Sequence, residues 1–413
     1  MTSSDAVTWH QRANDAARSV TALFGRRLLF LPNTHLAAVT WGGTGALRGP
    51  RRTLRAAADA AAVLDPWHYW WQAHYLDCLV DTGLRELGGG ATPAARFNGP
   101  GNPSAGRLAS RLVMGIRLRN LFTVVNSYYD DMAWLALATD RLDRLAAETR
   151  RPGRGRNARV RRSLTLQFDA AGSDDLGGGV FWSKKRDFKN TPANAPVALH
   201  YARTGRPARA QALVDWLDTT LFDPDQHLYL DGARAGTAGE VLVERTIYTY
   251  NQGPILGALL ELGGDANLAR AAALVAAVDG LLTVPAGSGE QGSGEKGSGE
   301  KGRVLRCEGS GDGGLFTGIL CRYLALAARD SRLPGQTRQA AARLVLDTAQ
   351  GFWDGRRKVL PGESARTPAE AVIFSAHASA PAEATFPAGA VVELSTQLQA
   401  WMAIEAATTV AAE

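Results

Sequence analysis

The sequence is organised around residues 126–138, which read NSYYDDMAWLALA. Two adjacent aspartates, Asp130 and Asp131, stand at the head of a strongly helical run, after two tyrosines and before a tryptophan. Carboxylates near a helix N-terminus are stabilised by the unpaired N–H groups there, so helix initiation is one ordinary reason to find them. Paired carboxylates among aromatic side chains are also what the cleavage of a sugar chain needs. One carboxyl group protonates the leaving oxygen while the other meets the anomeric carbon.

Helical periodicity dominates the rest of the chain, and the alternating patterns typical of strands are scarce. We predict twelve helices in one domain that spans residues 1–413. The even-numbered helices are apolar on almost all sides, as in residues 256–262 and 315–326, and such helices are buried. The odd-numbered helices are richer in arginine and aspartate, as in residues 107–119. The pattern therefore predicts an all-α fold, an (α/α)6 barrel of six helical hairpins with six inner and six outer helices.

In order, the predicted helices cover residues 8–29, 66–87, 104–123, the aspartate pair to 148, 157–171, a sixth that opens at 190, 207–221, 248–262, 266–282, 310–328, 335–352 and 388–407. The Gly-rich stretch at residues 177–188 is predicted to be a loop. Residues 287–302 form a short repeat of Gly, Ser, Glu and Lys with no apolar residue to bury. We expect this repeat to be a mobile surface loop.

The inner helices share a second feature, because each begins with aromatic or polar side chains. These clusters are residues 67–72, 128–131, 189–194, 250–252, 311–313 and 385–386. In an alternating barrel the six inner N-termini face one rim, so the clusters should converge on one cleft. Amides and carboxylates make directional hydrogen bonds with hydroxyls, which is the chemistry of a carbohydrate groove. The residues predicted to bind substrate are Trp70, Asp77, Tyr129, Trp182, Lys189, Asn190, Asn194, Tyr250, Asn251, Gln252 and Asp312.

Several of these residues have a second interpretation. Asp77 lies deep on its helix, so it either hydrogen-bonds inside the barrel or faces the cleft. Asp312 is also a candidate N-cap of the tenth helix. Trp70 and Trp71 are adjacent, so only one of them can easily face the cleft. The histidines of the second helix are interpreted as core or rim residues rather than metal ligands.

The composition is that of a globular protein, with 45% hydrophobic and 21% charged residues. The net charge of +6 is modest for 413 residues. Seven arginines and no acidic residue lie at residues 150–162. We interpret this run as a solvated turn that leads into a helix, so no nucleic-acid partner is expected.

The three cysteines, Cys78, Cys307 and Cys321, lack metal-ligand spacing, so no metal and no cofactor are expected. Their odd number argues against a disulfide framework and suits a reducing compartment. The N-terminal residues show no signal-peptide pattern, and no apolar run reaches about 18 residues. These features predict a cytoplasmic protein without a membrane span. The sequence leaves the oligomeric state open.

Residues 129–134, YDDMAW, resemble the aspartate-pair motif of glycoside hydrolase family 76, whose members are endo-α-1,6-mannanases. Residues 189–194, 249–253 and 318–324 resemble further motifs of that family, so the resemblance spans about residues 66–330. It implies an (α/α)6 barrel and a retaining mechanism, with Asp130 as nucleophile and Asp131 as general acid/base. The implied partner is a carbohydrate, an α-mannan or a manno-oligosaccharide. The chain departs from the family pattern at Thr317, where a lysine is common, and in lacking the export signal that the family usually carries.

Two alternatives to a mannanase remain at this stage. Sugar epimerases, isomerases and lyases use the same barrel, but they would rely on histidine bases, and the predicted rim contains only His68. A non-catalytic glycan-binding relative is the second alternative, and the intact aspartate pair weighs against it. Product analysis separates the first alternative from hydrolysis, and binding without turnover would identify the second.

Overall fold

The computed structural model describes residues 3–29, 31–42, 67–150, 154–287, 302–360, 363 and 370–411. Apart from its end residues 287 and 302, the predicted mobile repeat lies outside these ranges.

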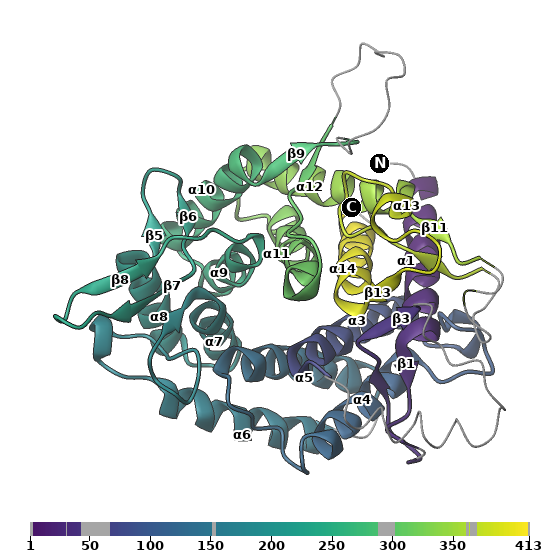
Figure 1. The fold of residues 1–413 in the computed structure, drawn as a ribbon, viewed down its shortest axis with the longest axis horizontal. Helices are drawn as coiled ribbons and strands as arrows, with labels where there is room; N and C mark the ends of the chain where they lie inside the picture. The colour runs from purple at the N-terminus through teal and green to yellow at the C-terminus, as the bar shows by residue number, and fades with distance from the viewer. Residues whose placement is uncertain are drawn as a thin grey trace.

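Six helices of the described chain form a closed inner ring (Figure 1). Each packs against the next, and the last packs against the first. Six outer helices surround them, each packed on an inner neighbour. The predicted (α/α)6 barrel is therefore confirmed. The inner helices are α3 (Tyr69–Gly88), α5 (Tyr129–Glu148), α7 (Thr191–Arg203), α9 (Thr249–Leu262), α11 (Phe316–Arg329) and α14 (Leu394–Ala411). The outer helices are α1 (Ser3–Phe24), α4 (Ala105–Arg119), α6 (Arg154–Ala171), α8 (Pro207–Thr220), α10 (Asp265–Leu281) and α12 (Gly335–Asp354).

The two rings differ in how much of each helix is buried. All residues of α14 except Thr409 are buried, as expected of a helix enclosed on all sides. The outer helix α10 buries only one face, through positions such as Ala271, Leu274 and Val278. Inner helices approach closely where glycine permits it. A Cβ atom on Gly318 of α11 would lie 2.5 Å from the Gln399 Cα of α14.

Short antiparallel strand pairs fill the connections between the helices. The largest of these sheets has three strands and joins the loop before α7 to the hairpin before α9, with Asn190 opposite Gly232 and Gly232 opposite Glu244. Its strands are β4 (Lys189–Asn190), β7 (Gly232–Ala235) and β8 (Val241–Glu244). The two-stranded pairs are β1 (Gly25–Arg26) with β2 (Leu36–Ala37), β3 (Thr40–Gly42) with β13 (Val391–Glu393), β5 (Phe222–Asp223) with β6 (Leu228–Tyr229), β9 (Thr283–Pro285) with β10 (Arg303–Leu305) and β11 (Arg357–Lys358) with β12 (Val372–Ile373).

The last inner helix begins later than predicted. Residues 388–393 do not belong to it, because Val391–Glu393 form β13, which pairs with β3. Thr385 ends the short helix α13 (Ala382–Thr385), and Phe386 follows it. The prediction that residues 385–386 open an inner helix is therefore wrong, since pairing with a distant strand overrides the local helical pattern.

Candidate active site

Asp130 and Asp131 occupy the first turn of α5, where the preceding chain is held by a neighbouring loop. The Tyr129 N–H donates to the Trp182 carbonyl at 2.8 Å, and Trp182 belongs to the loop that follows α6. The Trp182 N–H in turn donates to the Phe188 carbonyl at 2.8 Å. The start of α5 and the indole of Trp182 are thereby fixed relative to each other.

Each carboxylate of the pair has its own hydrogen-bond donor. Trp182 Nε1 donates to Asp130 Oδ2 at 2.9 Å, and the Asp131 N–H donates to Asp130 Oδ1 at 2.9 Å. Asn126 Nδ2 donates to Asp131 Oδ2 at 2.6 Å. Asn126 is oriented by the Tyr128 N–H, which donates to its Oδ1 at 3.0 Å. Among the described residues, Asp130 thus accepts two hydrogen bonds and Asp131 accepts one.

The protonation state of the pair follows from the burial of both carboxyl groups and from the different numbers of hydrogen bonds that they accept. Burial raises the pKa of Asp130 to about 7, although the hydrogen bonds from Asp131 and Trp182 oppose the rise. Burial and then the charge of Asp130 raise the pKa of Asp131 well above its usual range. Adjacent carboxyl groups titrate as a pair, so the pair keeps one proton near neutrality. Asp131 is the residue that holds this proton.

Asp312 joins the beginnings of two inner helices. It lies in the turn η3 (Gly311–Leu315) before α11, and its Oδ1 accepts from Trp70 Nε1 at 3.0 Å and from Trp71 Nε1 at 2.8 Å. Trp71 is buried, whereas Trp70 is partly exposed. The N-cap position of α11 is Leu315, so the interpretation of Asp312 as its N-cap is wrong.

Tyr250 and Phe316 form an aromatic wall beside the carboxylates. Their rings stack with centroids 3.8 Å apart and an interplanar angle of 13°, and the Tyr250 ring lies 6.5 Å from Trp70. Burial and the nearby charges of Asp231 and Asp130 raise the pKa of Tyr250, so its phenol stays neutral. Such flat faces suit the apolar side of a pyranose ring, while the phenol remains a donor.

A further carboxylate, Asp231, lies just before β7 and contacts the start of α9. Asn251 Nδ2 donates to Asp231 Oδ1 at 3.4 Å, and burial raises the pKa of Asp231 to about 6. Asn251 Oδ1 is buried without a hydrogen-bond partner in the described part of the chain. The two side chains therefore retain hydrogen-bonding capacity for a ligand.

Asn126, Asp231 and Phe316 belong to this site, but their roles were not predicted. Asn126 begins the stretch that contains the pair. Its position five residues before Asp131 is the sequence feature from which its role could have been predicted. Asp231 resembles an ordinary turn residue before glycine, and Phe316 resembles core in an apolar run. Only tertiary contacts place Phe316 against Tyr250 and Asp231 against Asn251, at the start of α9.

Asn194 and Gln252, which were predicted to bind substrate, hold the loops of the rim. Asn194 Oδ1 accepts from the Val180 N–H at 2.7 Å, and its Nδ2 donates to the Val180 carbonyl at 2.9 Å. Gln252 makes the same two bonds with Tyr229, both at 2.9 Å. A side-chain amide offers the donor and acceptor of a peptide group, so each residue pairs with a loop as a strand would. These bonds occupy the groups that the prediction assigned to sugar hydroxyls.

Lys189 has a comparable structural task. It is fully buried, and its Nζ donates to the carbonyls of Ser173, Asp175 and Gly178 at 3.1, 2.5 and 2.5 Å. The ammonium group therefore holds the Gly-rich loop before β4 rather than pointing to the pair. A buried cation is tolerated here because the carbonyls satisfy its donors.

Asp77 lies inside the barrel in an ion-pair network. Its carboxylate pairs with Arg141 of α5 and, at 2.8 Å, with Arg322 of α11. Both arginines also pair with Asp81, one turn further along α3. Of the two interpretations of Asp77, the structure favours hydrogen bonding within the barrel.

The remaining predicted residues, Tyr129 and Asn190, lie at helix starts. Tyr129 is buried at the first position of α5. Asn190 caps α7, because its Oδ1 accepts from the Ala193 N–H at 3.2 Å. No group of three or more His, Cys, Asp or Glu side chains in the described ranges could hold a metal ion. None of the helices in those ranges is long and apolar enough to cross a membrane.

The sequence profile of glycosyl hydrolase family 76 matches residues 119–364, which contain the aspartate pair, Trp182 and Asp312. No curated protein matches the chain at a significant level.

Solved structures resemble the chain over almost its whole length. The α-1,6-mannanase GH76A of Salegentibacter sp. HEL1_6 is 25% identical, with a TM-score of 0.68, covering 97% of this chain and 99% of that chain. An inactive variant of that enzyme, with asparagine at two consecutive aspartates, was solved with α-1,6-mannotriose. The Lin0763 protein of Listeria innocua is 21% identical (TM-score 0.68, 98% of both chains). The family 76 mannosidase Bt3792 of Bacteroides thetaiotaomicron is 16% identical (TM-score 0.64, 98% of both chains). The last two show likeness of fold alone.

Proposed function

Because the chain belongs to glycosyl hydrolase family 76, we propose that it cleaves α-1,6-linked mannose chains with retention of configuration. Asp130 is the nucleophile and Asp131 the general acid/base. Glycoside hydrolysis follows from the family, whereas the linkage, the stereochemistry and the two roles are parts of the proposal. Membership of this hydrolase family also argues against epimerase and lyase activity, the alternatives considered above.

The unequal hydrogen bonding of the two carboxylates is the observation that carries the assignment of roles. Asp130 accepts from an indole N–H and a backbone N–H, and both bonds favour its ionised form. Asp131 accepts only from Asn126 among the described residues and lies next to the negative charge of Asp130. A nucleophile must be ionised and an acid must hold a proton, so the geometry favours Asp130 for the first role and Asp131 for the second.

In the first step, an Asp130 oxygen attacks the anomeric carbon while Asp131 gives its proton to the glycosidic oxygen. The bond to the leaving sugar breaks, and a mannosyl ester forms on Asp130. In the second step, Asp131, now ionised, takes a proton from a water molecule, whose oxygen attacks the same carbon. The ester bond breaks, Asp130 is again a carboxylate and Asp131 is again protonated.

The choice of substrate is supported by the Salegentibacter enzyme, an α-1,6-mannanase whose inactive variant was solved with α-1,6-mannotriose. The walls of the site suit a sugar, because Tyr250, Phe316 and Trp70 offer flat faces. Asp231 and Asn251 offer polar atoms for hydroxyl groups.

The test is to replace each catalytic acid with its neutral isostere. Asp130→Asn and Asp131→Asn should each abolish the release of manno-oligosaccharides from α-1,6-mannan, with a fall of at least about 10³-fold in kcat/KM. Circular dichroism should show that both variants stay folded. For the wild-type protein, proton NMR of the fresh product should show the α-anomer first.

Asp225→Asn is the matched control, because Asp225 is exposed in the loop between β5 and β6 and makes none of the contacts described for the pair. This variant should keep full activity. Full activity of either Asp130→Asn or Asp131→Asn would overturn the assignment of that residue. A β-anomer as first product would overturn retention while leaving hydrolysis intact.

A further inference from the structure

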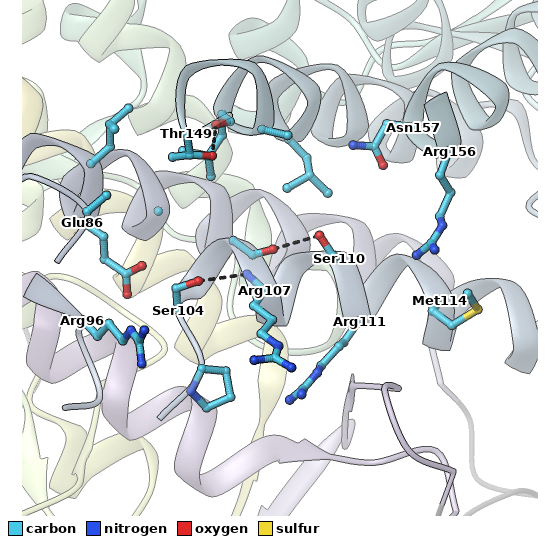
Figure 2. Close-up of a pocket in the computed structure, with 18 of the residues that line it drawn as sticks. Glu86, Arg96, Ser104, Arg107, Ser110, Arg111, Met114, Thr149, Arg156 and Asn157 are labelled. Atoms are coloured by element: carbon cyan, nitrogen blue, oxygen red, sulfur yellow. Dashed lines mark hydrogen bonds between the residues drawn. The ribbon is translucent and has the colours of Figure 1, made fainter. Parts of the chain in front are cut away.

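A cavity of about 730 Å³ lies outside the active site, beside the outer helices α4 and α6 (Figure 2). Its floor is formed by α3 and α5 near their C-terminal ends. Leu145 of this floor lies fourteen residues after Asp131 on α5, which corresponds to roughly 21 Å along the helix. The cavity is therefore distinct from the site of the aspartate pair.

One wall of the cavity is cationic and lacks a counter-ion. Arg107 and Arg111 lie one turn apart on α4, and Arg156 lies on α6 (Figure 2). None of the three side chains makes an ion pair or a hydrogen bond within the described part of the chain. Two like charges at this spacing destabilise a helix, so their arrangement is not explained by the stability of α4.

The charges of this wall act on one another. Burial, and then the positive charges of Arg107 and Arg27, lower the pKa of Arg111. The acidic residue of the lining, Glu86, does not neutralise them, because its oxygens accept the backbone N–H groups of Phe97 and Ala105. An anion that entered the cavity would therefore meet guanidinium groups without other acidic partners.

The floor is apolar, in contrast to the wall. Leu142, Leu145 and Ala146 of α5 and Gly83 of α3 are almost fully covered by protein. The apolar surface that stays open comes from Leu87, Pro103 and Met114, which are partly exposed. A Cβ atom at Gly83 would lie 2.5 Å from Leu145 Cδ2, so glycine there lets the leucine side chain cover the floor. Such a surface favours an aliphatic chain over water.

We propose that this cavity binds an anionic amphiphile, a molecule with one phosphate-like group on a single aliphatic chain. The anionic group lies against Arg107, Arg111 and Arg156, and the chain lies along the floor. The volume falls in the range of about 300–1,000 Å³ typical of small-molecule sites. An inorganic anion would leave the open apolar surface of Leu87, Pro103 and Met114 in water, and a neutral sugar would leave the arginines unpaired. This site does not depend on the proposed mannanase function.

The test uses isothermal titration calorimetry of the full chain with octyl phosphate below its micelle concentration. We expect one molecule bound per chain, with an affinity that falls as salt is added. Inorganic phosphate, which lacks the chain, and octyl glucoside, which lacks the charge, should each bind at least about tenfold more weakly. Equal binding of inorganic phosphate would overturn the amphiphile and leave a simple anion site.

The arginines are tested with Arg107→Ala/Arg111→Ala, which should weaken octyl phosphate binding at least about tenfold. Arg159→Ala is the control, since Arg159 is an exposed arginine of α6 outside the cavity lining. It should bind as the wild type does. Unchanged binding in the double variant, or no binding by the wild type, would overturn the proposal. Hydrolysis of α-1,6-mannan by the double variant shows that it is folded and reports separately on the active site.

Discussion

At the scale of single residues, Trp182 donates a hydrogen bond to Asp130, the proposed nucleophile. Its indole N–H stabilises the ionised form of Asp130, so it opposes the rise in pKa that burial causes. The same indole packs against Tyr128 with ring centroids 5.0 Å apart. A phenylalanine in its place would keep an aromatic ring and remove only the donor.

Trp182→Phe should therefore raise the pKa of Asp130 and shift the acidic limb of the kcat/KM profile, expected near pH 7, to higher pH. In the proposed mechanism, activity falls on this limb because Asp130 must be ionised to attack. The loss of a hydrogen bond to a charged group should also lower kcat/KM by about tenfold or more. The measurement is the pH profile of mannan hydrolysis.

Trp216→Phe is the control for Trp182→Phe, because Trp216 donates its N–H to the Leu176 carbonyl at 2.9 Å, away from the pair. Its acidic limb should stay at the wild-type pH. An acidic limb that does not move in Trp182→Phe would contradict the role given to the indole.

The raised pKa of Asp130 also predicts a cost in stability. A carboxyl group whose pKa rises from its ordinary value of 3.8 to about 7 on folding stabilises the folded state below pH 3.8 and loses that contribution as the pH rises to 7. Asp130→Asn has no ionisable group at this position, so it does not lose stability in this way. The Tm of Asp130→Asn minus the Tm of the wild type should therefore be larger at pH 8 than at pH 4. Thermal melts of both proteins at the two pH values measure the difference. A difference in Tm between the two proteins that is the same at both pH values would contradict the raised pKa of Asp130.

At the scale of elements, a recurring device fastens the loops of the rim to the inner helices. Besides Asn194 and Gln252, Gln72 bonds the N–H and carbonyl of Ala37 at 2.9 and 3.0 Å. Gln397 bonds those of Phe374, both at 2.8 Å. Four inner helices thus each carry an amide that pairs with a loop, and the loops position residues such as Trp182.

Gln252→Met tests this device. Methionine has a similar length but cannot bond the N–H and carbonyl of Tyr229, which are buried. The unfolding free energy should fall by about 3 kcal/mol, since buried polar groups lose their partners. Urea denaturation measures the change. Gln226→Met, at an exposed glutamine of the loop between β5 and β6, should change it by less than about 0.5 kcal/mol. Similar values for both variants would show that the amide does not hold the loop.

At the scale of the whole molecule, the inner ring is joined through buried charges as well as apolar contacts. Arg141, Arg322, Asp77 and Asp81 connect α5, α11 and α3 within the barrel. Burial opposes the ionisation of Asp77, but its two arginines keep its pKa below the usual value. Such a network costs stability when one member is removed, because a charge is left without its partner.

Asp77→Asn should lower the unfolding free energy by about 3 kcal/mol and leave KM for α-1,6-mannan nearly unchanged. The reason is that the arginines lose a charged partner while the groups around Asp130 and Asp131 are unchanged. Urea denaturation and steady-state kinetics measure the two quantities. A raised KM without loss of stability would show that Asp77 binds substrate after all.

The sequence by itself determined the helices, their division into buried and half-exposed classes, and the aspartate pair. These features depend on local periodicity and on neighbouring residues, so one stretch of chain contains them. Only the tertiary structure decided which polar side chains remain available to a ligand. Trp70 forms a hydrogen bond with Asp312, which lies 242 positions away in the sequence. Gln252 forms a hydrogen bond with Tyr229, from which a turn and a hairpin separate it in the sequence. An amide that binds sugar and one that binds a loop look alike in sequence, because hydrogen bonding depends on which partner the fold brings within about 3 Å.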